Sequence, residues 1–278
     1  MVVGIIGLGL IGGSFALSLR ENIKEEIMIV GYDNNPLHAK EALDLKIIDS
    51  SLSKDELKKI ADLIILAIPV SAIKDELKNM QNIKKNCTII DFGSTKESIV
   101  QSVPNEIREH FVAAHPMAGT EYSGPKAAFG SLLKGKVVVL CDIEDSGEAQ
   151  AELAKKIFNT IGMKIVYMSS KEHDRHAAFI SHTPHIISYA LANSVISQED
   201  KKSILTLAAG GFRDMSRLAK SSPSMWRDIV IENKETVLKS IDIFEKELLK
   251  AKELIKSESW EELHEWMKNA SSLHQLFD

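Results

Sequence analysis

The chain has little cysteine and no excess of positive charge, and both shortages limit what it can be. Only Cys87 and Cys141 occur among 278 residues, each in an apolar stretch that predicts a strand. Two separate buried thiols do not make the disulfide framework of a small secreted protein, and they fit a reducing compartment. The net charge of -5 leaves no extended basic surface for nucleic acid or an anionic membrane. We therefore expect a cytoplasmic protein without nucleic-acid or membrane partners.

We expect no signal peptide, although residues 2–19 are apolar. No basic segment precedes this apolar run, as a signal peptide would require. Its closely spaced glycines favour a strand followed by a tight turn over a membrane-spanning helix. No internal repeat or low-complexity tract is visible, and 44% hydrophobic residues suffice for the core of one large or two average domains.

Short β-branched runs alternate with amphipathic segments up to about residue 170, which is typical of βαβ units on a mostly parallel sheet. The predicted strands are nearly continuous apolar runs at residues 2–6, 27–31, 63–67, 88–91, 111–114 and 136–140. After Met168 helical spacing dominates, notably over 174–195 and 223–256, and a last helix begins near Trp260. The predicted fold class is α/β: an N-terminal Rossmann-like doubly wound parallel sheet, residues 1–169, and an all-helical C-terminal domain, residues 170–278.

The long helical segment at 223–256 predicts an interface between helices. Its apolar positions follow helical core spacing and would be buried against other helices, of this chain or of another; they are Ile229, Val237, Ile241, Phe244 and Leu248. A domain of this size seldom closes a core around one very long helix. We therefore expect a homodimer formed through the helical domain.

A glycine-rich motif follows the first predicted strand and opens an amphipathic helix, the context in which GxGxxG indicates dinucleotide binding. Gly7 permits a tight turn, Gly9 lets the backbone approach a pyrophosphate, and Gly12 lets the helix pack on the strand. The free N–H groups and the dipole of the helix N-terminus favour phosphates. The predicted cofactor-binding residues of this motif are Gly7, Leu8, Gly9, Leu10, Ile11 and Gly12.

Asp33 ends the second predicted strand, where its carboxylate can accept hydrogen bonds from both hydroxyls of an adenosine ribose. A 2′-phosphate would meet this negative charge, and residues 34–36 supply no arginine to neutralise it. We therefore predict NAD, not NADP, as the cofactor. Pro69 follows the strand at 63–67 and would pass beneath the cofactor. The alternative, a plain turn and a solvated Asp33, is disfavoured because the two features agree.

His115 closes the strand at 111–114, on the sheet edge where ligands bind, and Ser94 follows the preceding strand. A lone histidine at a strand end is more often structural. Here Ser94 can exchange a hydrogen bond with the ring and fix its orientation. Neutral imidazole, with an unperturbed pKa of about 6.5, suits the removal of a proton from a hydroxyl that loses hydride. We predict His115 as the base and Ser94 as its partner.

The helical half contributes His173-Asp174 and then His182 and His185, three residues apart. Metal binding is one interpretation, but no cysteine or carboxylate accompanies the latter pair as in the commoner zinc motifs. We rank substrate contact first, a structural role second and a metal third, and therefore predict no metal.

Two arginines, Arg213 and Arg217, come shortly after a glycine pair. Guanidinium forks suit carboxylates, whereas solvated basic groups at a helix end are the plainer alternative. A ligand with two negative charges would favour the first interpretation.

Taken in order, these motifs resemble the prephenate and arogenate dehydrogenase family over nearly the whole chain. The most specific are His115–Glu121 (HPMAGTE) and Ser181–His185 (SHTPH), accompanied by Gly7–Ser14, Asp91–Lys96 and Gly211–Asp214. The resemblance implies a Rossmann-like domain, a helical dimerisation domain and a site between them. It also implies NAD-dependent oxidative decarboxylation of prephenate to 4-hydroxyphenylpyruvate, a step of tyrosine biosynthesis.

The resemblance also implies roles for single residues. His115 would hydrogen-bond the ring hydroxyl and take its proton, and Ser94 would contact this histidine and the hydroxyl or the nicotinamide. Arg217 would hold the side-chain carboxylate of the substrate. His182 and His185 would also contact the substrate, and Glu121 would act as a gate at the entrance of the site. Asp214 and Trp226 would support the segment that carries the arginines. Arg213 is counted among the substrate-binding residues without a defined role.

Three alternatives stay open. Arogenate carries an ammonium where prephenate has a keto group, and a donor from His185 near the keto oxygen favours prephenate. Another two-domain hydroxyacid dehydrogenase would use a helical-domain lysine that these motifs do not include. A non-catalytic nucleotide-sensing dimer is disfavoured by the intact histidine, serine and arginine set. We expect neither a fused chorismate mutase in front nor a regulatory domain behind.

Overall fold

The computed structural model describes residues 1–276, which form two compact units. The first unit extends to Asn233 and the second begins at Lys234.

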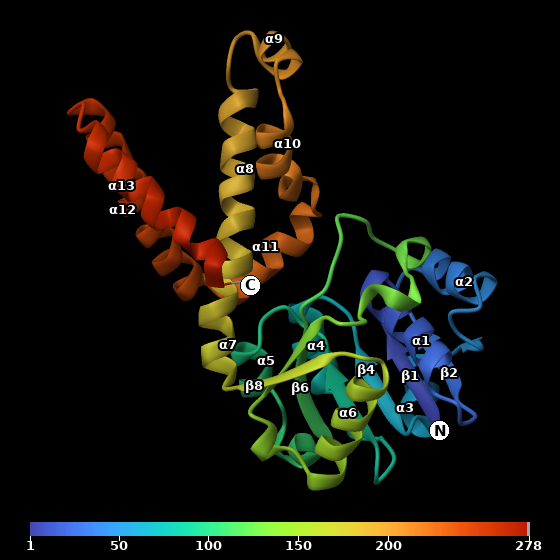
Figure 1. Ribbon diagram of the computed structural model, residues 1–278. Coiled ribbons are helices and arrows are strands. Elements are labelled where there is room, and N and C mark those ends of the chain that lie inside the picture. The colour runs from blue at the N-terminus through green and yellow to red at the C-terminus, as the bar shows by residue number, and fades with distance from the viewer. Residues whose placement is uncertain (277–278) are drawn as a thin grey trace. The chain divides into compact units, whose positions relative to one another are not determined.

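An eight-stranded sheet forms the centre of the first unit (Figure 1). Its strands are β1 (Val2–Ile6), β2 (Met28–Tyr32), β3 (Ser50–Ser51), β4 (Leu63–Leu66), β5 (Thr88–Asp91), β6 (Phe111–Pro116), β7 (Val137–Cys141) and β8 (Lys164–Met168). The order is β3-β2-β1-β4-β5-β6-β7-β8, so the direction of winding reverses between β1 and β4. In such sheets ligands bind outside the carboxyl ends of the strands at this reversal.

The sheet is parallel from β3 to β6, but β7 runs antiparallel to β6. A parallel return needs a crossover of a dozen or more residues, usually a helix. The segment from β6 to β7 contains only short 3-10 turns at Pro125–Ala127 and Gly130–Leu132. It therefore brings the chain back antiparallel, while α6 restores a parallel crossover between β7 and β8.

Helices cover both faces of the sheet, as the doubly wound prediction requires. They are α1 (Leu10–Asn22), α2 (Pro36–Asp44), α3 (Lys54–Ile60), α4 (Val70–Leu77), α5 (Glu97–Gln101) and α6 (Glu148–Thr160). Phe15, Phe92 and Phe158 form an aromatic cluster in one core layer, with ring centroids 5.0 to 6.4 Å apart. A second apolar layer includes Leu57 and Leu77 of α3 and α4.

The six predicted strands are confirmed to within two residues at each end, whereas β3 and β8 were missed. β3 has only two residues, both serine, and therefore no apolar run. β8 lies at the edge of the sheet and is largely exposed, so it lacks the continuous apolar pattern of a buried strand.

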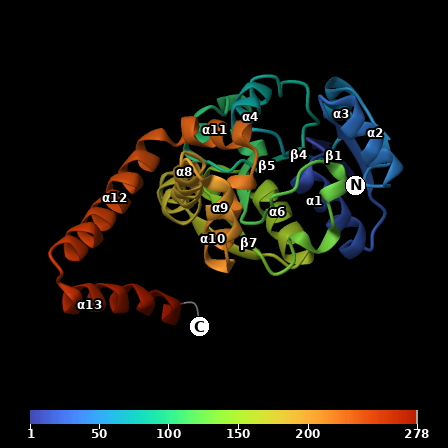
Figure 2. The ribbon, with the colours of Figure 1, turned by 90° about the horizontal axis from the view of Figure 1, so that it is seen from above.

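The helical part of the first unit consists of α7 (Ser170–Ala177), α8 (Thr183–Ile196), α9 (Lys201–Thr206), α10 (Gly210–Ser216) and α11 (Pro223–Glu232). A single π-helical turn, Ala178–His182, joins α7 to α8. Pro184 in the first turn of α8 has no N–H to donate to the preceding turn, which explains the wider turn there. α10 lies alongside α8, and α8 is seen end-on in Figure 2.

α11 is tied to α4 by polar contacts. Lys74 pairs with Glu232 at 2.7 Å, and the backbone N–H of Ser71 donates to Asp228 at 3.3 Å. These contacts explain why the first unit extends past the predicted domain boundary at residue 169. The division at 169/170 stays a prediction.

The predicted helix over 223–256 is interrupted at Asn233, where α11 ends and α12 (Lys234–Lys256) begins. The second unit consists of α12 and α13 (Trp260–Ser271), followed by a 3-10 turn at Ser272–Leu276. The indole N–H of Trp266 donates to Glu247 at 2.8 Å and joins the two helices. Among the described residues, no helix combines the length and the apolar character needed to cross a membrane.

Candidate active site

The glycine motif forms the turn between β1 and α1 that dinucleotide binding requires. Gly7 has a φ of +100°, and a Cβ there would lie 2.3 Å from the carbonyl oxygen of Ala67. A Cβ on Gly12 would lie 2.0 Å from the carbonyl oxygen of Gly7, so this position needs glycine for close packing. Gly9, by contrast, has no neighbour within 4 Å of a Cβ, which leaves room for a ligand against its backbone.

The N-terminus of α1 begins at Leu10, beside this open space. No side chain caps the helix and no acidic residue lies in its first turn. The first backbone N–H groups are therefore available to an anion, and the helix dipole adds partial positive charge. The observed loop fits the pyrophosphate of a dinucleotide.

Asp33 lies just past β2, next to the glycine loop. One carboxylate oxygen accepts the N–H of Leu8 at 2.9 Å and the other accepts the N–H of Asn35 at 2.9 Å. A carboxylate has about four lone-pair positions, so acceptor capacity is left for ribose hydroxyls. His38 on α2 lies 3.5 Å from the carboxylate.

The segment that follows His115 folds back over α1 and α2. The N–H of Phe129 donates to the hydroxyl of Ser14 at 3.1 Å, and a Cβ on Gly13 would lie 2.8 Å from that of Ala128. The two residues after the GxGxxG motif, Gly13 and Ser14, thus hold this segment on α1.

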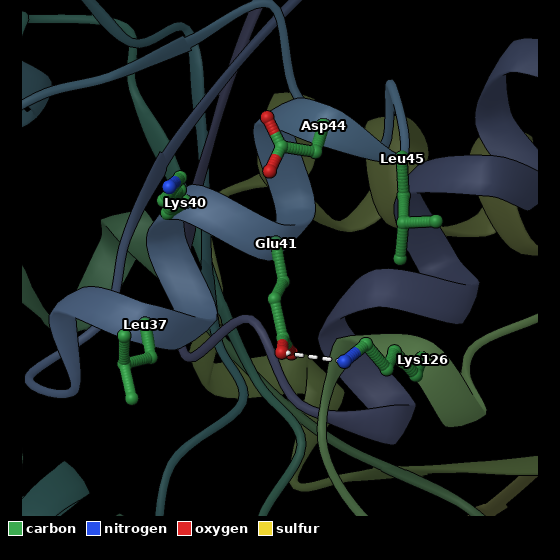
Figure 3. Close-up of a pocket in the computed structure, with 6 residues that line it drawn as sticks. All are labelled: Leu37, Lys40, Glu41, Asp44, Leu45 and Lys126. Atoms are coloured by element: carbon green, nitrogen blue, oxygen red, sulfur yellow. Dashed lines mark ion pairs between the residues drawn. The ribbon is translucent and has the colours of Figure 1, made fainter.

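A shallow pocket lies on α2 where this segment reaches it (Figure 3). Lys126 pairs there with Glu41 at 2.9 Å. The pocket is lined by Leu37, Lys40, Glu41, Asp44, Leu45 and Lys126, and it contains neither His115 nor any other histidine.

His115 lies near the carboxyl end of β6, beside the carboxyl end of β5, where Asp91 stands. Asp91 and Lys96 form a fully buried ion pair beneath it. The Asp91 carboxylate accepts the N–H of Ala114 at 3.2 Å, and the Lys96 ammonium donates to the carbonyl of Ala114 at 3.0 Å. Both backbone groups of Ala114 are thereby fixed, which positions the backbone of His115.

A chain of hydrogen bonds leads from His115 through His173 to Asp174. Nδ1 of His115 lies 2.8 Å from Nε2 of His173, and Nδ1 of His173 lies 2.8 Å from Oδ1 of Asp174. The Asp174 carboxylate also accepts the backbone N–H groups of Lys96 and Glu97, at 2.7 and 2.9 Å. His173 and Asp174 are each 2% exposed.

Burial holds the pKa of His115 well below its usual value of 6.5, and the nearby His173, Lys96 and His182 act in the same direction. The ring is therefore neutral at physiological pH. Its Nε2 atom has no hydrogen-bond partner among residues 1–276, and the ring is partly exposed. A neutral imidazole with an open nitrogen is equipped to accept a proton.

The predicted hydrogen bond between Ser94 and His115 is absent from the described residues; His173 is the partner of the ring instead. Ser94 lies after β5 and is partly exposed. The residue pair His173-Asp174 was visible in the sequence, but no spacing rule joins residue 173 to residue 115. Only the packing of α7 against the sheet brings them together.

His182, in the π-helical turn, is 1% exposed. Its Nδ1 lies 3.1 Å from the side-chain amide nitrogen of Asn233, which also donates to the carbonyl of Asp174 at 2.8 Å. Burial lowers the pKa of His182 to about 4, although Asp174 and the backbone of Ser94 oppose the shift. With an amide N–H donated to Nδ1, the neutral ring carries its proton on Nε2, an atom without a well-formed hydrogen bond in the described chain.

Asn233 was missed in the sequence because nothing in its neighbourhood distinguishes it. It lies where the long helical pattern breaks between α11 and α12, and its side chain is what orients His182.

His185 stacks on Trp226, with ring centroids 3.6 Å apart, and its Nδ1 lies 2.9 Å from the carbonyl of Ser181. A carbonyl only accepts, so Nδ1 carries the proton and Nε2 of the neutral ring is an acceptor. Burial lowers the pKa of His185, the Ser181 carbonyl opposes this, and Arg217 lowers it further. His185 can therefore donate from Nε2 to a keto oxygen only when its ring is protonated.

The remaining predicted residues lie at the surface of the first unit. Arg217 is exposed and close enough to His185 to affect its pKa, while exposed Arg213 donates to the carbonyl of Ala208 at 3.2 Å. Glu121 forms no side-chain hydrogen bond or ion pair within residues 1–276. Pro69 directly precedes α4, past the carboxyl end of β4. No three metal-ligating side chains gather anywhere in the described part of the chain.

The fold and the residues at the carboxyl edge of the sheet define a NAD-dependent dehydrogenase: a dinucleotide loop, an acidic residue after β2 and a neutral histidine at the end of β6. Comparisons with known proteins agree. The family model of the prephenate dehydrogenase nucleotide-binding domain matches residues 15–167, and that of its dimerization domain matches residues 169–269. The chain belongs to the prephenate dehydrogenase family.

Individual relatives cover most of the chain. The prephenate dehydrogenase of Bacillus subtilis is 35% identical over 275 residues, 96% of this chain and 73% of that protein. The cyclohexadienyl dehydrogenase of Zymomonas mobilis is 34% identical over 275 residues, 96% of this chain and 93% of that protein. The crystal structure of prephenate dehydrogenase from A. aeolicus in complex with hydroxyphenyl propionate and NAD+ has a TM-score of 0.92 and 36% identity, covering 100% of this chain and 98% of that one.

Proposed function

We propose that this enzyme catalyses the NAD-dependent oxidative decarboxylation of prephenate to 4-hydroxyphenylpyruvate. The observation that carries the proposal is the neutral His115 ring, with one nitrogen held by His173 and the other open, at the sheet edge that bears the dinucleotide loop. Membership of the prephenate dehydrogenase family indicates prephenate as the substrate.

The cofactor residues proposed are the loop Gly7–Gly12, Asp33, Pro69 and Ser94. The loop supports this because glycine is required at Gly7 and Gly12 and leaves space at Gly9. Asp33 favours NAD, since a 2′-phosphate would lie against a carboxylate that the described chain leaves without an arginine partner. Bound NAD supplies the hydride acceptor.

His115 acts as the general base. Its Nε2 takes the proton of the ring hydroxyl while the hydrogen on the same carbon leaves as hydride. The bond from the ring to its carboxylate breaks, carbon dioxide departs, and the electron pair of that bond completes the aromatic ring. The phenolate oxygen formed in this way then recovers the proton from Nε2 of His115. The protein therefore needs to orient the hydroxyl and accept one proton, and positioning supplies much of the acceleration.

His182, His185 and Arg217 are the proposed substrate contacts, with Arg213 and Glu121 as further members of the site. The buried Nε2–H of His182 is a donor without a well-formed hydrogen bond in the described chain. Arg217 offers a guanidinium fork for a carboxylate and lies near His185. A bound dianion next to His185 would raise the pKa of that ring and turn its Nε2 from an acceptor into a donor.

The experiment is NADH formation by the purified protein, with prephenate and arogenate offered separately and each repeated with NADP. We expect turnover with prephenate and NAD. Turnover with arogenate alone would transfer the same chemistry to that substrate and contradict the proposed one. Inactivity with both would refute the function.

We also propose a homodimer formed through a helical domain of residues 170–278. The apolar side chains of α12 and α13 support it, because Leu248, Leu249, Ile255 and Met267 are each more than half exposed in the single chain. Light scattering should give twice the chain mass, and Leu248→Glu should shift it to the monomer. The exposed substitution Lys250→Glu serves as the control.

A further inference from the structure

We propose that His173, held by Asp174, is a positioning residue that fixes the tautomer of His115 and thereby makes Nε2 the basic nitrogen of that ring. This inference rests on the proposed function, because it assigns a helper to the base of that reaction. It concerns residues on two separate elements, His115 on β6 and His173 on α7.

The neighbours of Asp174 fix the role of its carboxylate. Its two oxygens receive the backbone N–H groups of Lys96 and Glu97 at 2.7 and 2.9 Å, and Oδ1 also lies 2.8 Å from Nδ1 of His173. Three N–H donors around one buried carboxyl stabilise its ionised form, which can only accept hydrogen bonds. Nδ1 of His173 must therefore carry a proton.

In this proposal His173 is neutral; a neutral imidazole has one N–H and one lone pair, so a proton on Nδ1 of His173 leaves the lone pair on Nε2. That Nε2 lies 2.8 Å from Nδ1 of His115, a hydrogen-bond distance. Since His173 accepts there, Nδ1 of His115 must donate, and the lone pair of the His115 ring is left on Nε2. The other tautomer of His115 would bring two lone pairs together at 2.8 Å.

The same chain favours the charge that forms during the reaction. When Nε2 of His115 takes the hydroxyl proton, the ring becomes an imidazolium whose Nδ1–H already donates to His173. The hydrogen bond from His173 to the Asp174 carboxylate strengthens when His115 becomes charged, because linked hydrogen bonds polarise one another. Both His173 and Asp174 are 2% exposed and are therefore sheltered from water. Serine proteases use a histidine and an aspartate in this way, and an aspartate substitution that changes the histidine tautomer there costs about ten-thousandfold in turnover.

Charged and titratable groups surround His115 from several elements. His173 comes from α7, His182 from the π-helical turn, and Lys96, which directly precedes α5, pairs with Asp91 at the end of β5. Of these, only His173 has a hydrogen bond to the ring. The tautomer is thus controlled by one contact.

The direct test determines which nitrogen of the His115 ring carries the proton. Long-range nitrogen–proton NMR correlations of protein labelled with 15N-histidine report which ring nitrogen carries the proton, and the His115→Asn variant identifies the His115 signals. We expect Nδ1 protonated and Nε2 unprotonated in His115 at neutral pH. A proton on Nε2 would overturn the inference, whether or not the protein turns over prephenate.

The kinetic test compares three variants. His173→Leu removes the acceptor, His173→Gln keeps an acceptor oxygen near the former Nε2, and His176→Leu makes the same change on an exposed part of α7. We expect His173→Leu to lower kcat by about a hundredfold to ten-thousandfold. KM and the affinity for NAD should change less than about threefold, because the ring acts in the chemical step.

His173→Gln should retain at least about tenfold more turnover than His173→Leu, because an acceptor for Nδ1–H is restored. Equal losses in both variants would show that packing matters and not the acceptor, and would overturn the inference. A kcat of His173→Leu similar to that of His176→Leu would do the same. Should the wild type lack turnover with prephenate and with arogenate, the proposed function fails, while the NMR result still decides the tautomer.

Discussion

The buried ion pair between Lys96 and Asp91 gives the sharpest stability prediction. Both side chains are 0% exposed, and the pair fixes the N–H and the carbonyl of Ala114, next to His115. Lys96→Met keeps the length of the side chain but leaves the Asp91 carboxylate without its counter-charge. Removing one partner of a buried pair typically costs about 3–5 kcal/mol of the free energy of unfolding.

The loss in the free energy of unfolding caused by Lys96→Met should depend on pH. Burial raises the pKa of the Asp91 carboxyl, an effect that Lys96 opposes, so without Lys96 this pKa rises further. A carboxyl whose pKa is higher in the folded than in the unfolded state stabilises the fold at low pH, and this contribution is lost as the pH rises through the folded-state value. The deficit of Lys96→Met relative to the wild type should therefore shrink as the pH is lowered.

Urea unfolding followed by tryptophan fluorescence measures the effect between pH 5 and 8. Lys155→Met is the matched control, because Lys155 forms only a surface ion pair with Glu152, of the kind that contributes at most about 1 kcal/mol. Combining Lys96→Met with Asp91→Asn should restore part of the loss, since no buried charge is left unpaired. A loss below about 1 kcal/mol for Lys96→Met at pH 7 would refute the reasoning.

Three further predictions concern the site. His115→Asn keeps a side-chain donor toward His173 but has no basic nitrogen. In NADH assays kcat should therefore fall by at least about a hundredfold, while the Kd for NAD stays within about threefold of the wild-type value. Full turnover would rule out His115 as the base. Asp33→Asn keeps an acceptor for the N–H of Leu8 but removes the negative charge. The ratio of kcat/KM with NADP to kcat/KM with NAD should therefore rise about tenfold. An unchanged ratio would contradict the role of Asp33 in the preference for NAD. Burial lowers the pKa of His182 to about 4, so the folded protein favours the neutral ring. The contribution of this neutral ring to the free energy of unfolding is complete above about pH 6.5 and is lost as the pH falls toward 4. His182→Gln should flatten the pH dependence of urea unfolding in this window by up to about 3 kcal/mol, and an identical slope in wild type and variant would argue against it.

The sequence alone determined six of the eight strands and the cofactor loop, because both depend on local patterns. Continuous apolar runs located six strands, and glycine spacing after β1 located the turn that Gly7 and Gly12 form. Asp33 was found because a strand end and a glycine motif have a fixed relation in such sheets. The family was likewise recognisable from short motifs, since each motif lies within one stretch of chain.

Only the tertiary structure decided which groups act on His115. Its ring contacts His173, 58 residues further along the chain, and Asn233 reaches His182 across 51 residues. Such contacts depend on how α7 packs against the sheet and how α11 packs against α4, and a periodic pattern of apolar residues carries no information about them. The hydrogen-bond distances among these polar side chains, and with them the tautomers of the rings, follow from the packed fold and cannot be obtained from sequence spacing.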